Sequence, residues 1–321
     1  MKTNNPDNLK DRAELKRETE FVSRGGKRIL VAQTAGFCYG VQRAVDFAYE
    51  ACGTDKSGKG DGKIYTYGPI VHNDYVVKDL EKRGASVIPD FDTLRRMKET
   101  GELNGASVVI RAHGVGREVY ELLSEERDHI KIIDATCPYV RKIHKIVQEH
   151  AARGELIIVT GSGKHPEVIG ILGQIKGDAL VIEDASEAEE LQLKDNPHIC
   201  LVSQTTFSLQ KFEDIVAIFK KKQYNVDIIN TICNATKMRQ TEAANLALEC
   251  DAMIVIGGRN SSNTAKLCDI CRSGCKKTYY IQSVEDLDDT LDSVRCVGIT
   301  AGASTPKSII EEVLKYVRDE F

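Results

Sequence analysis

One local pattern occurs three times along the chain: a β-branched apolar run ends at a cysteine, and a helical pattern follows directly. The three segments are RILVAQTAGFCYGVQRAVDFAYEA, IKIIDATCPYVRKIHKIVQEHAA and VDIINTICNATKMRQTEAANLAL, which contain Cys38, Cys137 and Cys233. After each cysteine, apolar residues recur at the i, i+3, i+4 spacing of a helix. The cysteines lie about 97 residues apart. A unit of this length, repeated three times, predicts three similar small α/β domains.

The chain has 321 residues, enough for two or three domains, and the repeat favours three. The first residues mix both charge signs, so we expect a solvated extension over residues 1–26. The domains are then expected to span residues 39–137, residues 138–229, and residues 27–38 together with 230–321. If the units pack around a pseudo-threefold axis, the carboxyl ends of their strands converge at the centre, where α/β sheets bind ligands.

The composition argues against several classes of protein. Hydrophobic residues make up 41% and charged residues 29%, as in ordinary globular proteins. A formal net charge of −4 and a pI near 6.0 argue against nucleic acid as the main partner. No stretch approaches the 18 or so apolar residues of a membrane span. The N-terminus also lacks the apolar region of a signal peptide, so we expect a cytoplasmic protein.

Ten cysteines in a reducing compartment are expected to be core residues, metal ligands or catalytic thiols. A thiol at a helix N-terminus faces unpaired N–H groups and the positive end of the helix dipole, so its pKa is expected to be lowered toward thiolate. Thiolates bind iron or zinc. Cys38, Cys137 and Cys233 are therefore candidate metal ligands, and the alternative is that they are buried helix caps without a ligand.

The most compact cysteine group, CDICRSGC, contains Cys268, Cys271 and Cys275. Its spacing is similar to that of iron–sulfur runs. The same spacing places all three cysteines on one face of a helix, and cysteine is among the most buried residue types. We favour core packing for this group and keep a metal role as the alternative.

Each unit also contains two further strands that end in polar loops. They are KIYTYGPIVHN and ASVVIRAHGVG, then ELIIVTGSGKHPEV and HICLVSQTTFS, then CDAMIVIGGRNSSNT and CVGITAGASTP. The candidate site residues in these loops are His72, His113, His165, Glu167, Thr205, Thr206, Ser261, Ser262, Asn263 and Ser304. The remaining histidines lie in charged or turn contexts and are expected at the surface: His129, His144, His150 and His198.

This inventory suggests a chemistry. Three thiolates fill three corners of a tetrahedral site or bind three irons of a four-iron cluster, and both arrangements leave one position open, as a catalytic metal site requires. Histidine, serine and asparagine donors beside glycine-rich loops suit a polyanion such as diphosphate. Glu167 is the one acidic residue within the strand-end motifs. Taken singly, several of these residues are equally typical of turns, caps or buried structural positions.

Two other classes need to be weighed. The HPE sequence at residues 165–167 is similar to the H-x-E opening of zinc deaminases, but the P-C-x-x-C partner of that signature is missing. An iron–sulfur redox sensor also uses three cysteines. It has no need of an anion-binding loop set, and it normally carries a DNA-binding or output module, which this sequence lacks.

Nine short motifs, taken in order, resemble those of the 4-hydroxy-3-methylbut-2-enyl diphosphate reductase family. They are GFCYGV, IVHN, AHGV, DATCP, HPEV, SQTT, TICNAT followed by RQ, NSSN and TAGAS, from about residue 28 to about residue 306. Each motif is weak alone, but nine in order are specific. The resemblance implies a two-electron reductive dehydroxylation that yields isopentenyl and dimethylallyl diphosphates, the last step of the non-mevalonate route to isoprenoid precursors.

The resemblance also implies a trefoil-like fold around a [4Fe–4S] cluster bound by Cys38, Cys137 and Cys233, with the fourth iron open to the substrate oxygen. A ferredoxin or flavodoxin is implied as electron donor. Glu167 matches the acid at the allylic hydroxyl, with Thr205 as its partner, and Thr236 matches a polar residue near the cluster. The implied diphosphate contacts are His72, His113, His165, Ser261, Ser262, Asn263 and Ser304.

Two positions depart from the family pattern. Tyr39 is bulkier than the usual residue after the first cysteine, and Arg259 replaces a frequent lysine in the GGRNSSN loop.

Overall fold

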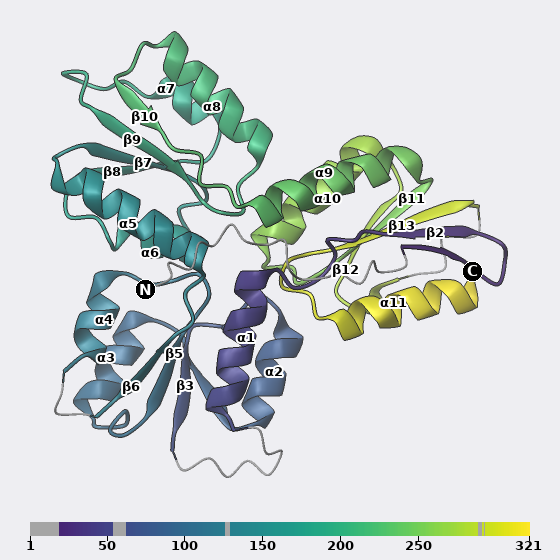
Figure 1. Cartoon of the computed structure of the whole chain (residues 1–321), viewed down its shortest axis with the longest axis horizontal. Helices are drawn as coiled ribbons and strands as arrows, with labels where there is room; N and C mark the ends of the chain where they lie inside the picture. The colour runs from purple at the N-terminus through teal and green to yellow at the C-terminus, as the bar shows by residue number, and fades with distance from the viewer. Residues whose placement is uncertain (1–18, 54–61, 126–128, 288–290, 292) are drawn as a thin grey trace, which may run out of the picture.

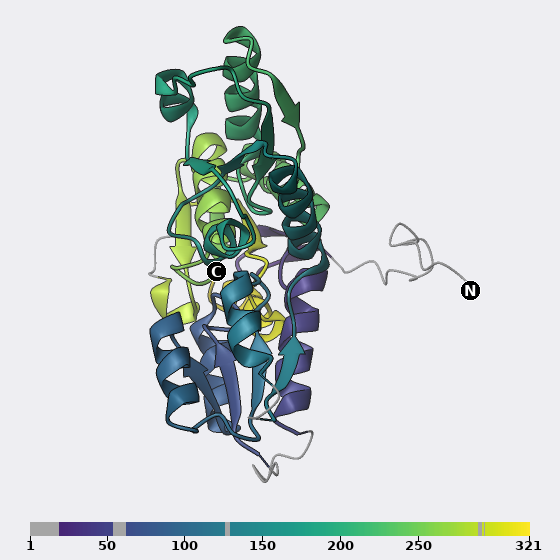
Figure 2. The same cartoon turned by 90° about the vertical axis from the view of Figure 1, so that its left-hand side faces the viewer.

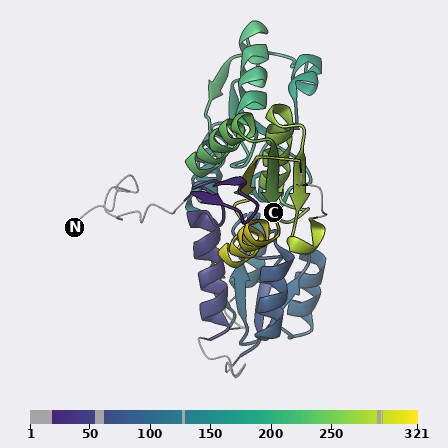
Figure 3. The same cartoon turned by 90° about the vertical axis from the view of Figure 1, so that its right-hand side faces the viewer.

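Three domains of similar size surround a common centre (Figure 1). The computed structural model describes residues 19–53, 62–125, 129–287, 291 and 293–321. Seen from its two sides, the molecule is flat, with all three domains in one layer (Figures 2 and 3). Each domain contains one sheet with helices packed against it. The sheets are parallel except for one added strand, and parallel strands require the helical crossovers that the sequence supplies between them.

The first domain has a four-stranded parallel sheet in the order β4-β3-β5-β6. Its strands are β3 (Ile64–Tyr67), β4 (Ala85–Ile88), β5 (Ser107–Ile110) and β6 (Lys131–Asp134). Its helices are α1 (Tyr39–Ala51), α2 (Asp74–Lys82), α3 (Phe91–Glu99) and α4 (Arg117–Leu123).

The second domain repeats this arrangement, with the strand order β8-β7-β9-β10. Its strands are β7 (Leu156–Thr160), β8 (Ala179–Ile182), β9 (Ile199–Ser203) and β10 (Val226–Ile228). Its helices are α5 (Pro138–Ala152), α6 (Pro166–Leu172), α7 (Ala185–Glu190) and α8 (Leu209–Lys221).

The third domain has the order β12-β11-β13-β2-β1 and joins the two ends of the chain. Its strands are β1 (Glu20–Val22), β2 (Arg28–Val31), β11 (Ala252–Ile256), β12 (Thr278–Ile281) and β13 (Cys296–Ala301). Its helices are α9 (Asn234–Glu249), α10 (Ser262–Gly274), the 3-10 turn η2 (Val284–Asp286) and α11 (Lys307–Glu320).

The repeated strand order confirms three similar α/β domains. In each sheet the fourth position is taken by the strand that leads to a cysteine: β6, β10 or β2. Because β2 belongs to the beginning of the chain, the third domain is completed by a strand whose residues pair with β13 residues 268 positions later, as in Arg28 with Cys296. The limits predicted for the domains remain a prediction. The first two predicted ranges each contain one whole sheet, and the third contains its sheet except for β1.

The prediction of a solvated extension over residues 1–26 is wrong for its last part. Glu20–Val22 forms β1, which pairs antiparallel with β2 and extends the third sheet. Arg28 joins Glu20 and Glu249 in ion pairs, and Phe21 packs against the core of the domain. The charged residues that suggested a solvated segment therefore flank an edge strand. Residues 1–18 lie outside the described part of the chain.

Each sheet separates two hydrophobic clusters because its central strands are buried on both faces. In β7, Ile158 packs into one cluster, while Ile157 and Val159 pack into the other. The cysteine stripe of α10 behaves as core, as predicted: Cys268 and Cys271 are buried against Met253 and neighbouring apolar residues. Among the described residues, no helix has the length and apolar character needed to cross a membrane.

Candidate functional site

The three repeated cysteines occupy the same position in their domains. Each is the N-cap residue of a long helix, α1, α5 or α9, and each has an extended backbone. Each cysteine N–H donates to a carbonyl oxygen in the loop after the adjacent strand of its sheet. The three pairs are Cys38 with Ala303 at 3.3 Å, Cys137 with Ala112 at 3.0 Å, and Cys233 with Thr205 at 3.1 Å.

These bonds attach each cysteine to a loop that carries a predicted substrate residue. Ala112 precedes His113, Ala303 precedes Ser304, and Thr205 is itself a predicted contact. The thiols and the polar strand-end residues therefore belong to one centre. The domains also touch there: a Cβ placed on Gly40 of α1 would lie 2.4 Å from the Sγ of Cys137, so only glycine allows this approach.

The predicted lowering of the thiol pKa is wrong for two of the three cysteines. Burial raises the pKa of Cys137 to about 12, and backbone N–H groups at the start of α5 only partly oppose it. Burial likewise raises the pKa of Cys233, whose Sγ lies 3.1 Å from the Oγ1 of Thr236. Negative charge on Cys38 would raise both pKa values further, because it lies near both thiols. At Cys137 and Cys233 the helix dipole alone does not stabilise a thiolate, whereas coordination to a metal deprotonates a thiol outright.

Two side chains of α9 fix the loop that presents Cys38. The Glu242 carboxylate accepts hydrogen bonds from the backbone N–H groups of Gln33 and Thr34, at 2.7 and 2.9 Å. The buried guanidinium of Arg239 donates to the carbonyl oxygens of Thr34 and Gly36. The first cysteine is therefore positioned by the helix that begins at the third, Cys233.

The three predicted histidines come from three different loops, after β3, β5 and β7, and form a compact group. The ring centroids of His72 and His113 are 4.6 Å apart, and that of His165 lies 5.5 and 5.3 Å from them. One ring nitrogen from each histidine lies within 4.8 Å of the chosen nitrogens of the other two. The Nε2 of His72 and the Nδ1 of His113 are buried without a hydrogen-bond partner in the protein, which indicates that a ligand satisfies them.

All three imidazoles are held neutral. Burial lowers the pKa of His72, His113 and His165, the last to about 3, and the positive charge of Arg111 lowers all three further. The Nδ1 of His165 accepts the N–H of Glu167 at 3.1 Å, which leaves its Nε2 as a donor. Neutral donors beside Arg111 favour an anion at this point over a metal cation.

Glu167 and Thr205 form a buried pair. The two carboxylate oxygens accept hydrogen bonds from the N–H and the Oγ1 of Thr205, at 2.5 and 2.7 Å. Glu167 is 2% exposed, and burial raises its pKa despite these bonds. The pair lies near the thiols, because the charge of Glu167 raises the pKa of Cys137 and Cys233. A buried carboxyl group with a raised pKa binds a proton more readily than an exposed one, which suits it to proton delivery.

The third domain contributes the predicted hydroxyl and amide groups. Ser261 is the N-cap of α10, and both amide atoms of the buried Asn263 lack a partner in the protein. Ser304 donates to the carbonyl oxygen of His72 at 3.2 Å, which joins the third domain to the first. Gly258 approaches the same carbonyl so closely that a Cβ would lie 2.5 Å from it. The loops of the two domains therefore meet at the histidine group.

The structure adds two cationic residues that the sequence reasoning missed. The ammonium of Lys266 donates to the Oγ of Ser262 at 3.0 Å and to the carbonyl of Thr206 at 2.9 Å, and burial lowers its pKa to about 8. Arg111 lies on the histidine loop, with an unpartnered, buried Nε. Sequence signals existed for both: Lys266 follows Ser262 by four helical positions, and Arg111 stands two residues before His113.

The expectation that the other histidines are surface residues is correct for His129 but wrong for His144, which is 6% exposed. His150 is half-buried and His198 is exposed; both contact Glu155. His150, Glu155 and Asp227 each offer one atom to a group that could hold a metal ion. The guanidinium of Arg153 pairs with Glu155 at 2.7 Å, so this group is an ion-pair network at the far edge of the second sheet.

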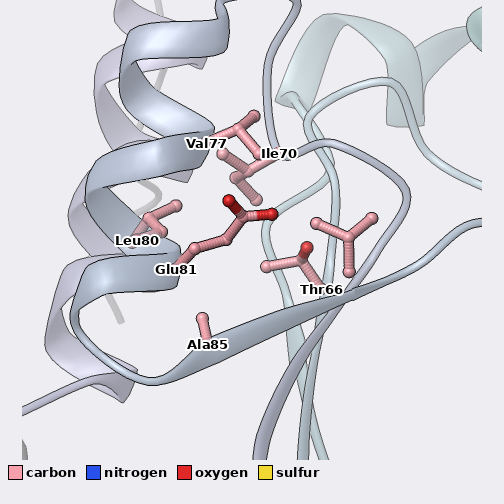
Figure 4. Close-up of a pocket in the computed structure, with 7 residues that line it drawn as sticks. Thr66, Ile70, Val77, Leu80, Glu81 and Ala85 are labelled. Carbon is pink, nitrogen blue, oxygen red and sulfur yellow. The ribbon is translucent and has the colours of Figure 1, made fainter.

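A small pocket in the first domain is separate from this centre. It lies between α2 and the β3–β4 edge, and the carboxylate of Glu81 points into it (Figure 4). Its lining is otherwise mostly apolar, and it contains none of the predicted site residues. We assign it no role in the site.

Comparison with known proteins identifies the family. The family model described as LytB protein matches residues 29–318. The chain belongs to the LytB family. This LytB chain is 42% identical to a Caldanaerobacter subterraneus protein over 90% of its own length and 96% of the relative. It is 40% identical to a Clostridioides difficile protein over 91% of its length and 99% of the relative. Both relatives are named 4-hydroxy-3-methylbut-2-enyl diphosphate reductase.

Solved structures agree with this assignment. A reductase from Plasmodium falciparum superposes on this LytB chain with a TM-score of 0.80 and 31% identity, covering 90% of this chain and 87% of that one. A second structure, named as the terminal enzyme of the non-mevalonate pathway, gives a TM-score of 0.60 and 38% identity, with 89% and 97% covered. These neighbours confirm the three-domain α/β fold.

Proposed function

We propose that this chain reduces 4-hydroxy-3-methylbut-2-enyl diphosphate to isopentenyl and dimethylallyl diphosphates, as the last step of the non-mevalonate pathway. The observation that carries the proposal is the meeting of cysteines from all three domains with a neutral histidine group beside Arg111 and Lys266. The names of the LytB relatives support the reaction.

Cys38, Cys137 and Cys233 fit a [4Fe–4S] cluster as ligands. All three thiols are half-buried at helix starts, and burial raises the pKa of Cys137 and Cys233, so a free thiolate is disfavoured there and a bound metal would have to displace the thiol protons. When bound there, the cluster would supply electrons and an open iron position for the substrate oxygen.

The diphosphate group is proposed to bind at the histidines. His72, His113 and His165 present neutral N–H donors, and Lys266 and Arg111 supply the positive charge. Unpartnered polar atoms on His72, His113 and Asn263 match the many acceptor oxygens of such a group. Further contacts are proposed from Ser261, Ser262, Asn263 and Ser304. The substrate would be held by its diphosphate end, which is remote from the reacting carbon, and this binding would orient that carbon toward the thiols.

Glu167 is proposed to deliver the proton that leaves with the substrate hydroxyl as water. Its raised pKa favours the protonated form, and Thr205 fixes the direction of the carboxyl group through two hydrogen bonds. Among the described residues, Glu167 is the acidic side chain buried between the thiols and the histidine loops. We further propose a cytoplasmic location and an external electron donor such as a ferredoxin or flavodoxin.

The test is anaerobic turnover with dithionite-reduced methyl viologen, followed by identification of the products. We expect both isoprenoid diphosphates. Hydrolysis to free phosphate or an unreduced alcohol would indicate a zinc-hydrolase type of site. Substrate binding without turnover would favour a redox sensor.

A further inference from the structure

We propose that the first turns of α1, α5 and α9 form a docking surface for an acidic one-electron carrier protein. The inference rests on the proposed function, which needs electrons from outside the chain. The docking surface is defined by Tyr39, Tyr139 and Met238 together with Lys142 and Lys145.

Large apolar side chains are exposed near the start of all three cysteine-bearing helices. Tyr39 is 67% exposed, Tyr139 42% and Met238 62%. One exposed apolar residue is ordinary on a protein surface. Here, however, each of the three helices that begin at the common centre carries one exposed apolar residue. The fold does not require this pattern, because none of the three side chains fills a core.

The three helices lie on one face of the flat molecule. In Figure 1 each starts near the middle and runs outward. Figure 2 shows α1 and α5 along the same side, and Figure 3 shows α1 and α9 along the same side. The exposed residues at their starts therefore belong to one surface around the pseudo-threefold axis.

The charge of this surface is opposite to that of the chain. Residues 39–48, 138–147 and 234–243 contain six Lys and Arg residues against two Asp and Glu. One of the six, Arg239, is buried, so five basic and two acidic residues are at least partly exposed, whereas the whole chain has a net charge of −4. An acidic carrier would be attracted to this face, and such attraction speeds the encounter of weak electron-transfer partners. A basic carrier would be repelled.

A cleft beside Cys137 extends the surface. It has a volume of about 240 Å³ and is lined by basic residues Arg141 and Lys145, with Asp134 paired to Arg141 at 2.9 Å. Its remaining lining is polar: Tyr120, Thr136, His144, Gln148 and Gln174. An acidic side chain of the partner fits such a recess. Thr136 directly precedes Cys137 in the chain, and Lys145 belongs to both the cleft and the docking surface, so the recess lies beside the start of α5.

The surface is close enough to the thiols for electron transfer. Tyr39 follows Cys38 directly, and Tyr139 follows Cys137 by two residues. Consecutive Cα atoms are about 3.8 Å apart, so a carrier touching these side chains lies on the order of 10 Å from the sulfur atoms.

The test compares two reductants on one pair of variants. In Lys142→Glu/Lys145→Glu, kcat/KM for a reduced acidic ferredoxin should fall by about tenfold at low salt and approach the unmodified value as salt rises. Turnover with reduced methyl viologen should stay within about twofold, since a small dye needs no docking surface. The matched control is Lys220→Glu/Lys221→Glu, which makes the same charge change at the outer end of α8 (Figure 1).

Three results would overturn the docking proposal: an unchanged ferredoxin rate, an equal fall in the control, or an equal fall with viologen. Absence of turnover with either reductant in the unmodified protein would instead remove the proposed function, and the docking proposal with it. The two failures are therefore distinguishable.

A second inference comes from an independent pair of cysteines in the third domain. The Sγ atoms of Cys250 and Cys296 are 3.5 Å apart. Asp251 holds them in register: its N–H donates to the carbonyl of Cys296, and its carboxylate accepts the N–H of Cys296, both at 3.0 Å. Cys296 is half-buried and Cys250 is buried. We infer that this pair is a site of reversible oxidation to a disulfide.

Hydrogen peroxide is the oxidant for this step. The more exposed thiol, Cys296, attacks one peroxide oxygen and becomes a sulfenic acid with loss of water. The thiol of Cys250 then displaces the second water and forms the S–S bond. One peroxide is reduced to two waters while two thiols are oxidised.

Peptide mass spectrometry under non-reducing conditions tests the pair. After brief peroxide treatment, a peptide joining residues 250 and 296 should appear and should vanish with dithiothreitol. In Cys250→Ala, Cys296 should proceed to the sulfinic acid, because its partner is missing. Two free, alkylatable thiols after peroxide, or linkage of either to another cysteine, would overturn the inference.

Discussion

The carboxylate of Glu167 accepts hydrogen bonds from both the N–H and the Oγ1 of Thr205. These residues follow β7 and β9, adjacent strands of the second sheet, so the sheet itself fixes their separation. The backbone of Thr205 also accepts the N–H of Cys233. The proposed proton donor and a proposed cluster ligand are therefore held by one residue.

Replacing Glu167 with glutamine should lower turnover by about 10²–10⁴-fold, because the amide cannot deliver a proton. Iron content and substrate affinity should stay close to normal, since the side-chain shape is kept. Steady-state rates and iron analysis on the same preparation check this. The control is Glu155→Gln, which changes a buried glutamate outside the site and should keep its turnover. Unchanged turnover in Glu167→Gln would exclude Glu167 as the proton donor.

Replacing Lys266 with methionine should weaken diphosphate binding by about 10-fold or more, since a buried cation and its bond to Ser262 are both lost. The effect should appear in the substrate Kd, measured by calorimetry, more than in the maximal rate. Lys98→Met removes another buried lysine, in the first domain, where it pairs with Glu125. That variant should lose stability and retain substrate affinity. Equal affinities in the two variants would show that Lys266 is structural.

The cysteines should divide into two classes. Cys137→Ser should lose most bound iron, because a proposed ligand is removed. Cys271→Ala should keep its iron and lose stability by about 1–2 kcal/mol, because a buried side chain in the third-domain core is shortened. Iron analysis and urea unfolding of both variants distinguish the classes. Loss of iron in Cys271→Ala would revive a metal role for the α10 cysteine stripe.

Stability should depend on pH through His144. Burial lowers its pKa from 6.5 to about 4, so the unfolded chain binds its proton first as the pH falls. Stability is therefore unaffected by this group above pH 6.5 and falls between about 6.5 and 4, by about 1.4 kcal/mol per pH unit. In His144→Gln, the slope of the unfolding free energy against pH should be smaller by about 1.4 kcal/mol per pH unit over that range, because one titrating group is lost. Parallel profiles for the two proteins would contradict this.

The repeated cysteine pattern was sufficient to predict the three domains, because each repeat is a local strand–helix signal at a nearly constant spacing. It also placed the histidine loops at strand ends, where parallel topology brings them together. β1 was missed because its flanking charges resemble those of a solvated segment, and only pairing with β2 reveals a strand.

The remaining errors arise from burial, which is a tertiary property. His144 shares its helix face with Val140 and Val147, so its position in the pattern indicated burial that its charged neighbours obscured. The pKa values of Cys137 and Cys233 could not be obtained from helix position, because desolvation by burial outweighs the local N–H groups. Lys266 was overlooked since lysine is rarely buried.

We propose that Cys38, Cys137 and Cys233 share one inorganic cluster with an open iron. The direct measurement is iron, sulfide and zinc analysis of anaerobically purified protein, with Mössbauer spectra before and after addition of substrate. We expect about four irons and four sulfides per chain, with one iron signal that changes when substrate binds. One zinc per chain without sulfide, or four iron signals indifferent to substrate, would contradict the account.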